Sequence, residues 1–170
     1  ITLADKWLQG VGRLAELRAA VIEAREHEVK HSRTDDTSYH AEYEEKTTDA
    51  AKQAAAAFTA YGALVTDDAE RALFDKLGKA WAGYQDSQAK VLALGRAAKQ
   101  QDAAEISDGA ASMAFDETLG ALTDLVRQGK VRYIGCSNFP ASEIVEAQWA
   151  ADRRNSERFK GVNDLVFDSL

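Results

Sequence analysis

The chain has 170 residues, of which 45 % are hydrophobic, and its formal net charge is −7. This length suits one domain with a sizeable core, or one domain with an appendage. The sequence contains no apolar run of the roughly 18 residues that a membrane span needs and no recognisable signal peptide, and its acidic balance without a dense basic stripe argues against nucleic acid as a partner.

The first predicted element is a long helix over about Thr2–Arg33. Its seam residues recur every three to four positions, which is typical of a helix packed nearly parallel to its neighbours. They are Leu3, Trp7, Gly10, Leu14, Leu17, Val21 and Ala24. The polar cluster Ser32–Ser38 then breaks the pattern and offers N-caps. Because Ile1 begins in mid-pattern without an initiator Met, we expect the chain to be a piece of a longer protein.

Three further helices follow. The second carries Tyr39, Tyr43, Ala50, Ala54, Ala57, Tyr61 and Leu64, and the third carries Leu73, Leu77, Ala80, Tyr84, Ser87, Val91, Leu94 and Ala98. Thr66–Glu70 separates them as a second turn-and-cap signal. We expect Ser107–Ala111 to open the fourth helix, with Phe115, Leu119, Leu122 and Val126 on its seam. Long helices joined by short turns predict an all-α fold, an antiparallel up-down-up-down four-helix bundle.

The fourth helix, if it begins at Ser107 and ends at Val126, is too short to match its partners. Removing Arg127–Phe159 would place Val162, Val166 and Leu170 in phase with its seam. We therefore predict a bundle domain made of residues 1–126 and 160–170, and an atypical segment, residues 127–159, that interrupts the fourth helix.

Within this insert, Val131–Cys136 is rich in residues that favour extended chain, and Gly129 and Gly135 punctuate it. A helical bundle offers such a strand no partner, and unpaired buried backbone groups are costly. We therefore expect a loop over residues 127–139 and a short helix over residues 140–154. Cys136 has no base beside it in sequence, so nucleophilic chemistry is unsupported.

A family resemblance is carried by the first three helices, with the runs ADKWLQGVGRLAELRAAVIEAREHEVKHS, YHAEYEEKTTDAAKQAAAAFTAYGALVT and FDKLGKAWAGYQDSQAKVLALGRAAKQQD. Together they resemble the sensor domain of bacterial chemoreceptors, the methyl-accepting chemotaxis proteins, over residues 1 to about 113, with residues 160–170 a plausible remainder. The resemblance implies a periplasmic domain of an inner-membrane receptor, lying between two membrane helices that are absent here. It also implies a homodimer that binds a small organic acid or amino acid and signals across the membrane.

Chemoreceptors of this type hold an acidic ligand with arginines of the first helix, near the membrane-distal dimer interface. The resemblance therefore implies a ligand site at Arg18 and Arg25, joined by Tyr43 and Thr118 from the distal parts of the second and fourth helices. A planar guanidinium suits bidentate carboxylate binding. The alternative is that the arginines pair on a solvated surface with Glu16, Glu23 or Glu26. Gly10 and Gly12 predict a low surface on the first helix where a second copy could approach.

A second resemblance concerns Glu117–Phe159, with the run LVRQGKVRYIGCSNF. This segment resembles part of an aldo-keto reductase barrel, and in that family the residues matching Ser137 and Asn138 line the nicotinamide site. One strand-and-helix piece of an eight-stranded barrel cannot form its active site, so we expect neither an enzyme nor a bound cofactor. Two alternatives stay open, which are a natural or engineered helical chimera with no ligand and a nicotinamide-binding fragment.

The run HEVKH, residues His27–His31, fits the short H-E-x-x-H pattern of zinc proteases. The only other histidine, His40, lies across a predicted turn, and no edge strand is available to hold a peptide substrate. We therefore predict no metal and no catalytic residue, and interpret these histidines as solvated groups or as part of a polar ligand site.

Overall fold

A computed structural model of the chain describes residues 3–127. Over these residues the elements are all helical: α1 (Leu3–Arg33), α2 (Thr37–Gly62), α3 (Asp68–Arg96), α4 (Gln100–Ile106), the π-helical turn η1 (Ser107–Ala111) and α5 (Ser112–Leu125). The last three follow one another without a break and make up the fourth helix of the bundle. The all-α four-helix bundle predicted from the sequence is therefore confirmed. No helix in this part of the chain is long and apolar enough to cross a membrane.

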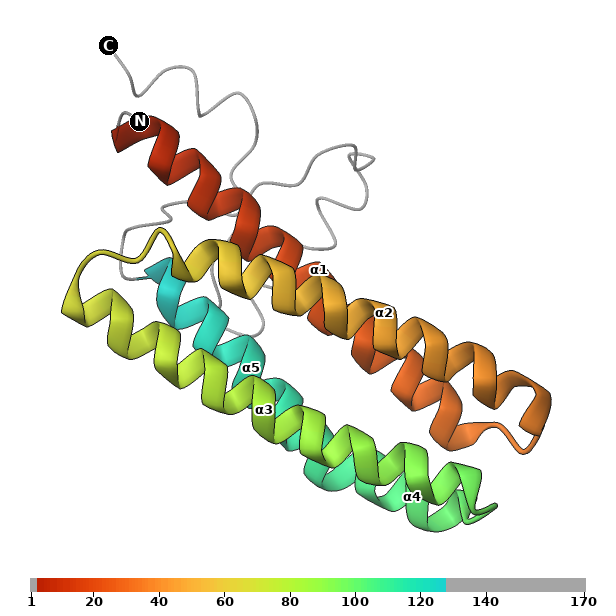
Figure 1. Ribbon diagram of the computed structural model, residues 1–170. Coiled ribbons are helices and arrows are strands. Elements are labelled where there is room, and N and C mark those ends of the chain that lie inside the picture. The colour runs from red at the N-terminus through yellow and green to blue at the C-terminus, as the bar shows by residue number, and fades with distance from the viewer. Residues whose placement is uncertain (1–2, 128–170) are drawn as a thin grey trace, which may run out of the picture.

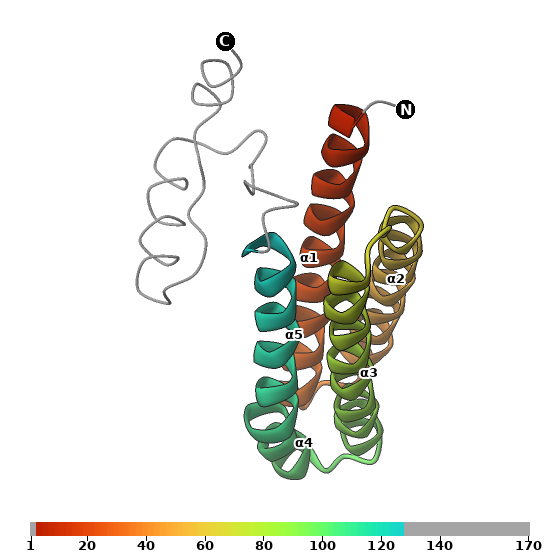
Figure 2. The ribbon, with the colours of Figure 1, turned by 90° about the vertical axis from the view of Figure 1, so that its left-hand side faces the viewer.

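The helices form two antiparallel hairpins that pack side by side (Figure 1). α1 pairs with α2, and α3 pairs with the continuous helix α4–η1–α5. The turns at residues 34–36 and 97–99 lie together at one end of the bundle, which we call the distal end. The turn at residues 63–67 lies at the opposite, proximal end, beside the beginning of α1 and the end of α5 (Figure 2).

Local capping fixes where the second and third helices begin. Asp36 accepts hydrogen bonds from the backbone N–H of Ser38 at 2.9 Å and from its hydroxyl at 2.6 Å. Asp67 accepts from the backbone N–H of Glu70 at 2.9 Å. Each bond satisfies an N–H group that has no partner inside its helix. Both polar clusters that the sequence marks as turns are therefore turns in the structure.

The core is built from the predicted seams. Its buried members on α1 and α2 include Leu14, Leu17, Val21, Ala24, Ala50, Ala54, Ala57 and Tyr61, and those on α3 and α5 include Leu77, Tyr84, Val91, Leu122 and Val126. Tyr39 was also predicted on the seam but is 48 % exposed. It lies in the first turn of α2, where its ring stacks on that of Tyr43 with the centroids 6.0 Å apart.

The fourth helix begins at Gln100, and not at Ser107 as predicted. The run Ser107–Ala111 has the polar and glycine composition of a cap, but Ser107 is fully buried inside the helix. The true start follows a tight turn in which Ala98 has a φ of 57°. The fourth helix is therefore comparable in length to its partners, and the length argument for an interruption loses its support. The domain division at residues 126 and 127, the expected loop over residues 127–139 and the short helix over residues 140–154 fall almost wholly on residues 128–170, which lie outside the described part of the chain.

Two glycines of α3 give a matched test of this packing. A Cβ added to Gly95 would lie 2.4 Å from Cε1 of the His31 ring, whereas one added to Gly83 would meet nothing within 4 Å. Gly95→Ala should lower the free energy of unfolding by about 1–3 kcal/mol, because the buried ring must move. Gly83→Ala should raise it by about 0.5–1 kcal/mol, because alanine favours an exposed helix interior. Urea unfolding of both variants measures the two values, and a Gly95→Ala variant as stable as Gly83→Ala would contradict the packing.

Candidate functional site

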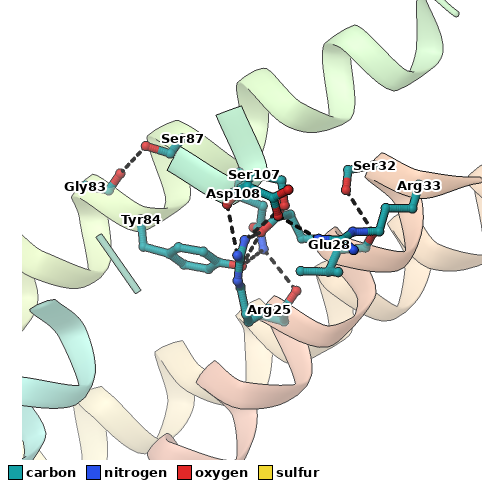
Figure 3. Close-up of polar contacts among 12 residues, drawn as sticks. Arg25, Glu28, Ser32, Arg33, Gly83, Tyr84, Ser87, Ser107 and Asp108 are labelled. Carbon is teal, nitrogen blue, oxygen red and sulfur yellow. Dashed lines mark hydrogen bonds and ion pairs between the residues drawn. The ribbon is translucent and has the colours of Figure 1, made fainter. Parts of the chain in front are cut away.

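A buried ion pair lies in the distal half of the core, between the two hairpins. Glu28 on α1 is fully buried, and its Oε2 atom accepts a hydrogen bond from the guanidinium of Arg25, one turn earlier on the same helix. The same oxygen accepts from the hydroxyl of Tyr84 on α3 at 3.2 Å. Gln88, one turn after Tyr84, donates to the Tyr84 hydroxyl at 3.1 Å and to the Ala24 carbonyl at 3.4 Å. Figure 3 shows Arg25, Glu28 and Tyr84 converging in this way.

Arg25 also binds the π-helical turn of the fourth helix. Its Nη2 donates to the Ser107 carbonyl at 2.9 Å and its Nη1 to the Ser107 hydroxyl at 3.2 Å (Figure 3). The Ser107 carbonyl also accepts from the backbone N–H of Ser112, so both of its lone pairs are used. The guanidinium further lies over the Phe115 ring, 5.9 Å from its centroid. One arginine thus connects α1 to η1 and α5, and we call Arg25, Glu28, Tyr84, Gln88 and Ser107 the core network.

Burial determines how much each charge of the Arg25–Glu28 pair depends on the other for its stability. The side chain of Arg25 is 13 % exposed and that of Glu28 is 0 % exposed. Burial, together with the nearby Glu28 carboxylate, raises the pKa of Tyr84 far above its ordinary value, so Tyr84 stays a hydrogen-bond donor. In such surroundings an ion pair roughly offsets the cost of desolvating its two charges, while either charge alone is strongly unfavourable.

A second polar group, which we call the tip cluster, lies at the distal end and consists of His31, His40, Glu44, Arg96 and Gln100. The His31 and His40 rings are stacked with centroids 4.2 Å apart. Nε2 of His31 lies 3.1 Å from Oε1 of Glu44, which also accepts from Nε of Arg96 at 2.8 Å. The hydrogen bond from Arg96 and the contact with His31 hold the pKa of Glu44 below its ordinary value, against the effect of burial.

The predicted ligand residues fall into two places. Arg18 and Arg25 lie seven residues apart on α1, so both face the fourth helix. Arg18 is half-buried and lines a cavity of about 40 Å³ together with Val11, Leu14, Ala15, Leu119, Leu122, Thr123 and Val126. One water needs about 10–15 Å³ of such cavity volume, so this cavity has room for a few waters and is too small for an organic acid in the present arrangement of the helices.

Tyr43 and Thr118 do not join Arg18 and Arg25 in one site. Tyr43 stacks on the His27 ring at 6.2 Å, on the side of α1 away from Arg25. Thr118 is fully buried on α5, and its hydroxyl donates to the Ala114 carbonyl at 2.8 Å. A bond of this kind satisfies the threonine within its own helix. The four residues therefore form no single constellation within the described residues.

Sequence reasoning missed most of the core network. It weighed Glu16, Glu23 and Glu26 as partners for the arginines, and Arg13–Glu16 is such a surface pair, at 2.8 Å. The spacing of Arg25 and Glu28, three residues apart on one helix, was a usable signal. The sequence around Ser107 carried no such signal, because its partner Arg25 lies 82 positions away.

The HEVKH histidines do not converge on a metal position. Nε2 of His27 lies 3.9 Å from Glu23, while His31 turns toward His40 and Glu44. Residues 3–127 contain no group of three or more His, Cys, Asp or Glu side chains that could hold a metal ion. The interpretation of His27 and His31 as solvated groups is wrong, since both are buried.

Comparison with known proteins adds one match. The family model described as "four helix bundle sensory module for signal transduction" matches residues 2–130. No curated protein and no solved structure matches the chain. None of these comparisons supports the resemblance of residues 117–159 to an aldo-keto reductase. The part of that segment that the structure describes, residues 117–127, begins in α5 and lies inside the matched range.

The core network predicts that a single substitution lowers the free energy of unfolding much more than a double substitution that removes both charges. Arg25→Ala leaves the Glu28 carboxylate buried without its cation, and should lower the free energy of unfolding by about 3–5 kcal/mol. The double variant Arg25→Met, Glu28→Met removes both charges and should be much closer to wild type. The control Arg13→Ala breaks an exposed pair and should cost at most about 1 kcal/mol. Chemical unfolding measures all three, and a double variant less stable than Arg25→Ala would contradict this account of the pair.

Proposed function

The chain belongs to the family of four-helix-bundle sensory modules for signal transduction, and on that premise we propose that it is the extracytoplasmic, periplasmic sensor domain of a chemoreceptor. In this proposal two copies associate through α1 and bind a small carboxylate or amino acid beside Arg18. The signal then passes along the bundle to membrane helices that belong to the rest of the protein. Family membership is the observation that carries the proposal, and the residues of α1 supply its details.

The proposed dimer surface is a strip of small and apolar residues on the outer face of α1. Leu8, Gly12, Ala15, Ala19 and Ile22 are all exposed and recur at alternating intervals of four and three positions. This spacing is that of a helix-pairing seam. Leu8 is 65 % and Ile22 is 42 % exposed, which is unusual for large apolar side chains. Of the two glycines expected on this surface, only Gly12 belongs to it, because Gly10 is buried, and a Cβ added to it would lie 3.7 Å from Cε2 of Tyr61.

Arg18 lies where this strip meets the groove between α1 and α5. Ala15, one turn earlier, belongs both to the exposed strip and to the lining of the small cavity. A second copy packed on the strip would wall the groove on its open side, and a carboxylate held there would face a half-buried guanidinium. Arg25 is a weaker candidate for this contact, because moving it to a ligand would leave the buried Glu28 carboxylate without its cation.

A ligand in this position would act on the relative arrangement of α1 and α5. The cavity beside Arg18 is too small for an organic acid, so binding requires these helices to shift or the partner copy to complete the site. A ligand that favours one arrangement over another changes their populations, and this is sufficient for signalling.

Titration calorimetry of the chain with a panel of dicarboxylates and amino acids tests the ligand. We expect saturable heat with at least one member of the panel. Arg18→Ala should then weaken binding by roughly 1.5–3 kcal/mol, the scale of a hydrogen bond to a charged group. Arg13→Ala, which removes an exposed arginine from the same helix, should leave the affinity unchanged. No heat with any compound in a folded sample would favour a helical chimera without a ligand.

Sedimentation equilibrium tests the dimer surface. Ile22→Lys places a charge at the distal end of the strip, and should weaken self-association by at least about tenfold, because the charge must be desolvated when the helices pair. Ala55→Lys, on the exposed face of α2, serves as the matched control and should not change self-association. A wild-type chain that stays monomeric at high concentration, with and without a ligand, contradicts the dimer.

A further inference from the structure

The tip cluster joins all four helices of the bundle at one point. His31 comes from α1, His40 and Glu44 from α2, Arg96 from the last turn of α3 and Gln100 from the first turn of α4. Gln100 donates through Nε2 to the backbone carbonyls of Thr34 and of His31, the latter at 3.2 Å, and so ties the start of α4 to the end of α1. The two distal turns are therefore held to each other by the hydrogen bonds of Gln100, beside the stacked rings of His31 and His40.

The two rings have little room and little access to water. His31 is 0 % exposed and His40 is 7 % exposed. Gly95 packs against the Cε1–Nδ1 edge of the His31 ring so closely that an added Cβ would lie 2.6 Å from Nδ1. That Nδ1 atom is buried without a hydrogen-bond partner, and Nε2 of His40 lies 3.0 Å from the Thr34 carbonyl. A proton added to Nδ1 of His31 would therefore be buried without an acceptor in this arrangement.

Charged and polar groups from α2, α3, α4 and the turn before α2 surround the two histidine rings. Glu44 faces His31 from α2 and favours its protonation, but the same oxygen binds the Arg96 guanidinium from α3. From α4, the group that faces the rings is the neutral amide of Gln100, whose Nε2 lies 3.3 Å from Nε2 of His40. The carboxylate of Asp36, in the turn before α2, interacts electrostatically with His40. If both rings were protonated, two positive charges would be stacked 4.2 Å apart with Arg96 beside them.

We propose that the tip cluster is a pH-sensitive switch, in which neutral His31 packs the distal ends of the helices together and its protonation in mildly acidic solution releases the two distal turns. Through this switch the module responds to acidic pH as well as to a ligand. The switch depends on contacts within one copy of the chain, and it does not require the ligand or the dimer proposed above.

The direction of the pH effect follows from His31. Burial, helped by His40 and Arg96 and opposed by the contact with Glu44, holds the pKa of His31 below its ordinary value. A histidine in the unfolded or opened chain titrates near pH 6.5. The stability that neutral His31 supplies is therefore fully present above about pH 6.5. It is lost as the pH falls from there through the lower pKa of the closed state, because only the opened state takes up the proton readily.

Two measurements on the intact chain test the switch. Proton NMR of the histidine Cε1–H signals gives the titration of His31 directly, and amide hydrogen exchange, corrected for its intrinsic pH dependence, reports opening of the distal turns. We expect His31 to titrate below pH 6.5. We also expect exchange around residues 31–40 and 95–101 to be at least about tenfold faster at pH 5 than at pH 7.5, since one pKa unit corresponds to a factor of ten. Exchange around residues 58–74, at the proximal end, should change much less.

Two substitutions distinguish the role of His31, which belongs to the stacked pair, from that of His27, which is buried outside it. His31→Gln retains a donor for Glu44 but cannot titrate, so the pH dependence of exchange at the distal turns should be lost. His27→Gln removes the histidine that lies outside the pair and should keep that pH dependence. Titration of His31 at or above pH 6.5 in the wild-type chain would overturn the switch. So would distal turns whose exchange does not change while His31 titrates. Both of these readings use the wild-type chain and remain decisive if His31→Gln does not fold.

Discussion

The buried pair of Arg25 and Glu28 constrains the rest of this bundle. A carboxylate with no exposed surface stays charged only if cations and hydrogen-bond donors surround it. Here the donors come from α1 and, through Tyr84, from α3. The arginine that neutralises the carboxylate must in turn reach the fourth helix, where Ser107 accepts from it. The two hairpins are therefore held in one register by polar contacts with fixed geometry. Apolar packing also joins the hairpins, but it is less directional than a hydrogen bond.

This constraint explains why the two ends of the bundle differ. Toward the proximal end the core is largely apolar, with Tyr61 and Glu70 as a local hydrogen-bonded pair at 2.9 Å. In the distal half, the core network and the tip cluster place charged or titratable groups between the helices. Polar contacts lose their energy steeply when distances and angles change. Small shifts of the helices therefore change the free energy of the distal half more than that of the apolar half, and this property suits a module whose function is to respond to its surroundings.

The fold was predictable from the sequence because the bundle depends on periodicity. The seam residues of α1, such as Leu14, Leu17 and Val21, recur at intervals that specify a buried helix face, and Asp36 and Asp67 mark the turns with short-range caps. Ser107 misled the prediction because its polar neighbours resemble a cap, while its actual role depends on an arginine from a distant part of the chain. The site was less predictable for the same reason. Residue type identified Arg18 and Arg25 as candidates, but only the packing shows that Arg25 is bound by Glu28 and Ser107 whereas Arg18 lies at the edge of the α1–α5 groove.

The division of roles between these two arginines is the central claim, and a crystal structure of the chain grown with the carboxylate that it binds most tightly tests it most directly. The account predicts that the ligand carboxylate lies within hydrogen-bond distance of the Arg18 guanidinium, at the edge of α1 that faces the second copy. Arg25 should still bind Glu28 and Ser107 in that structure. A carboxylate bound to Arg25, with the Glu28 side chain displaced from it, would contradict the account.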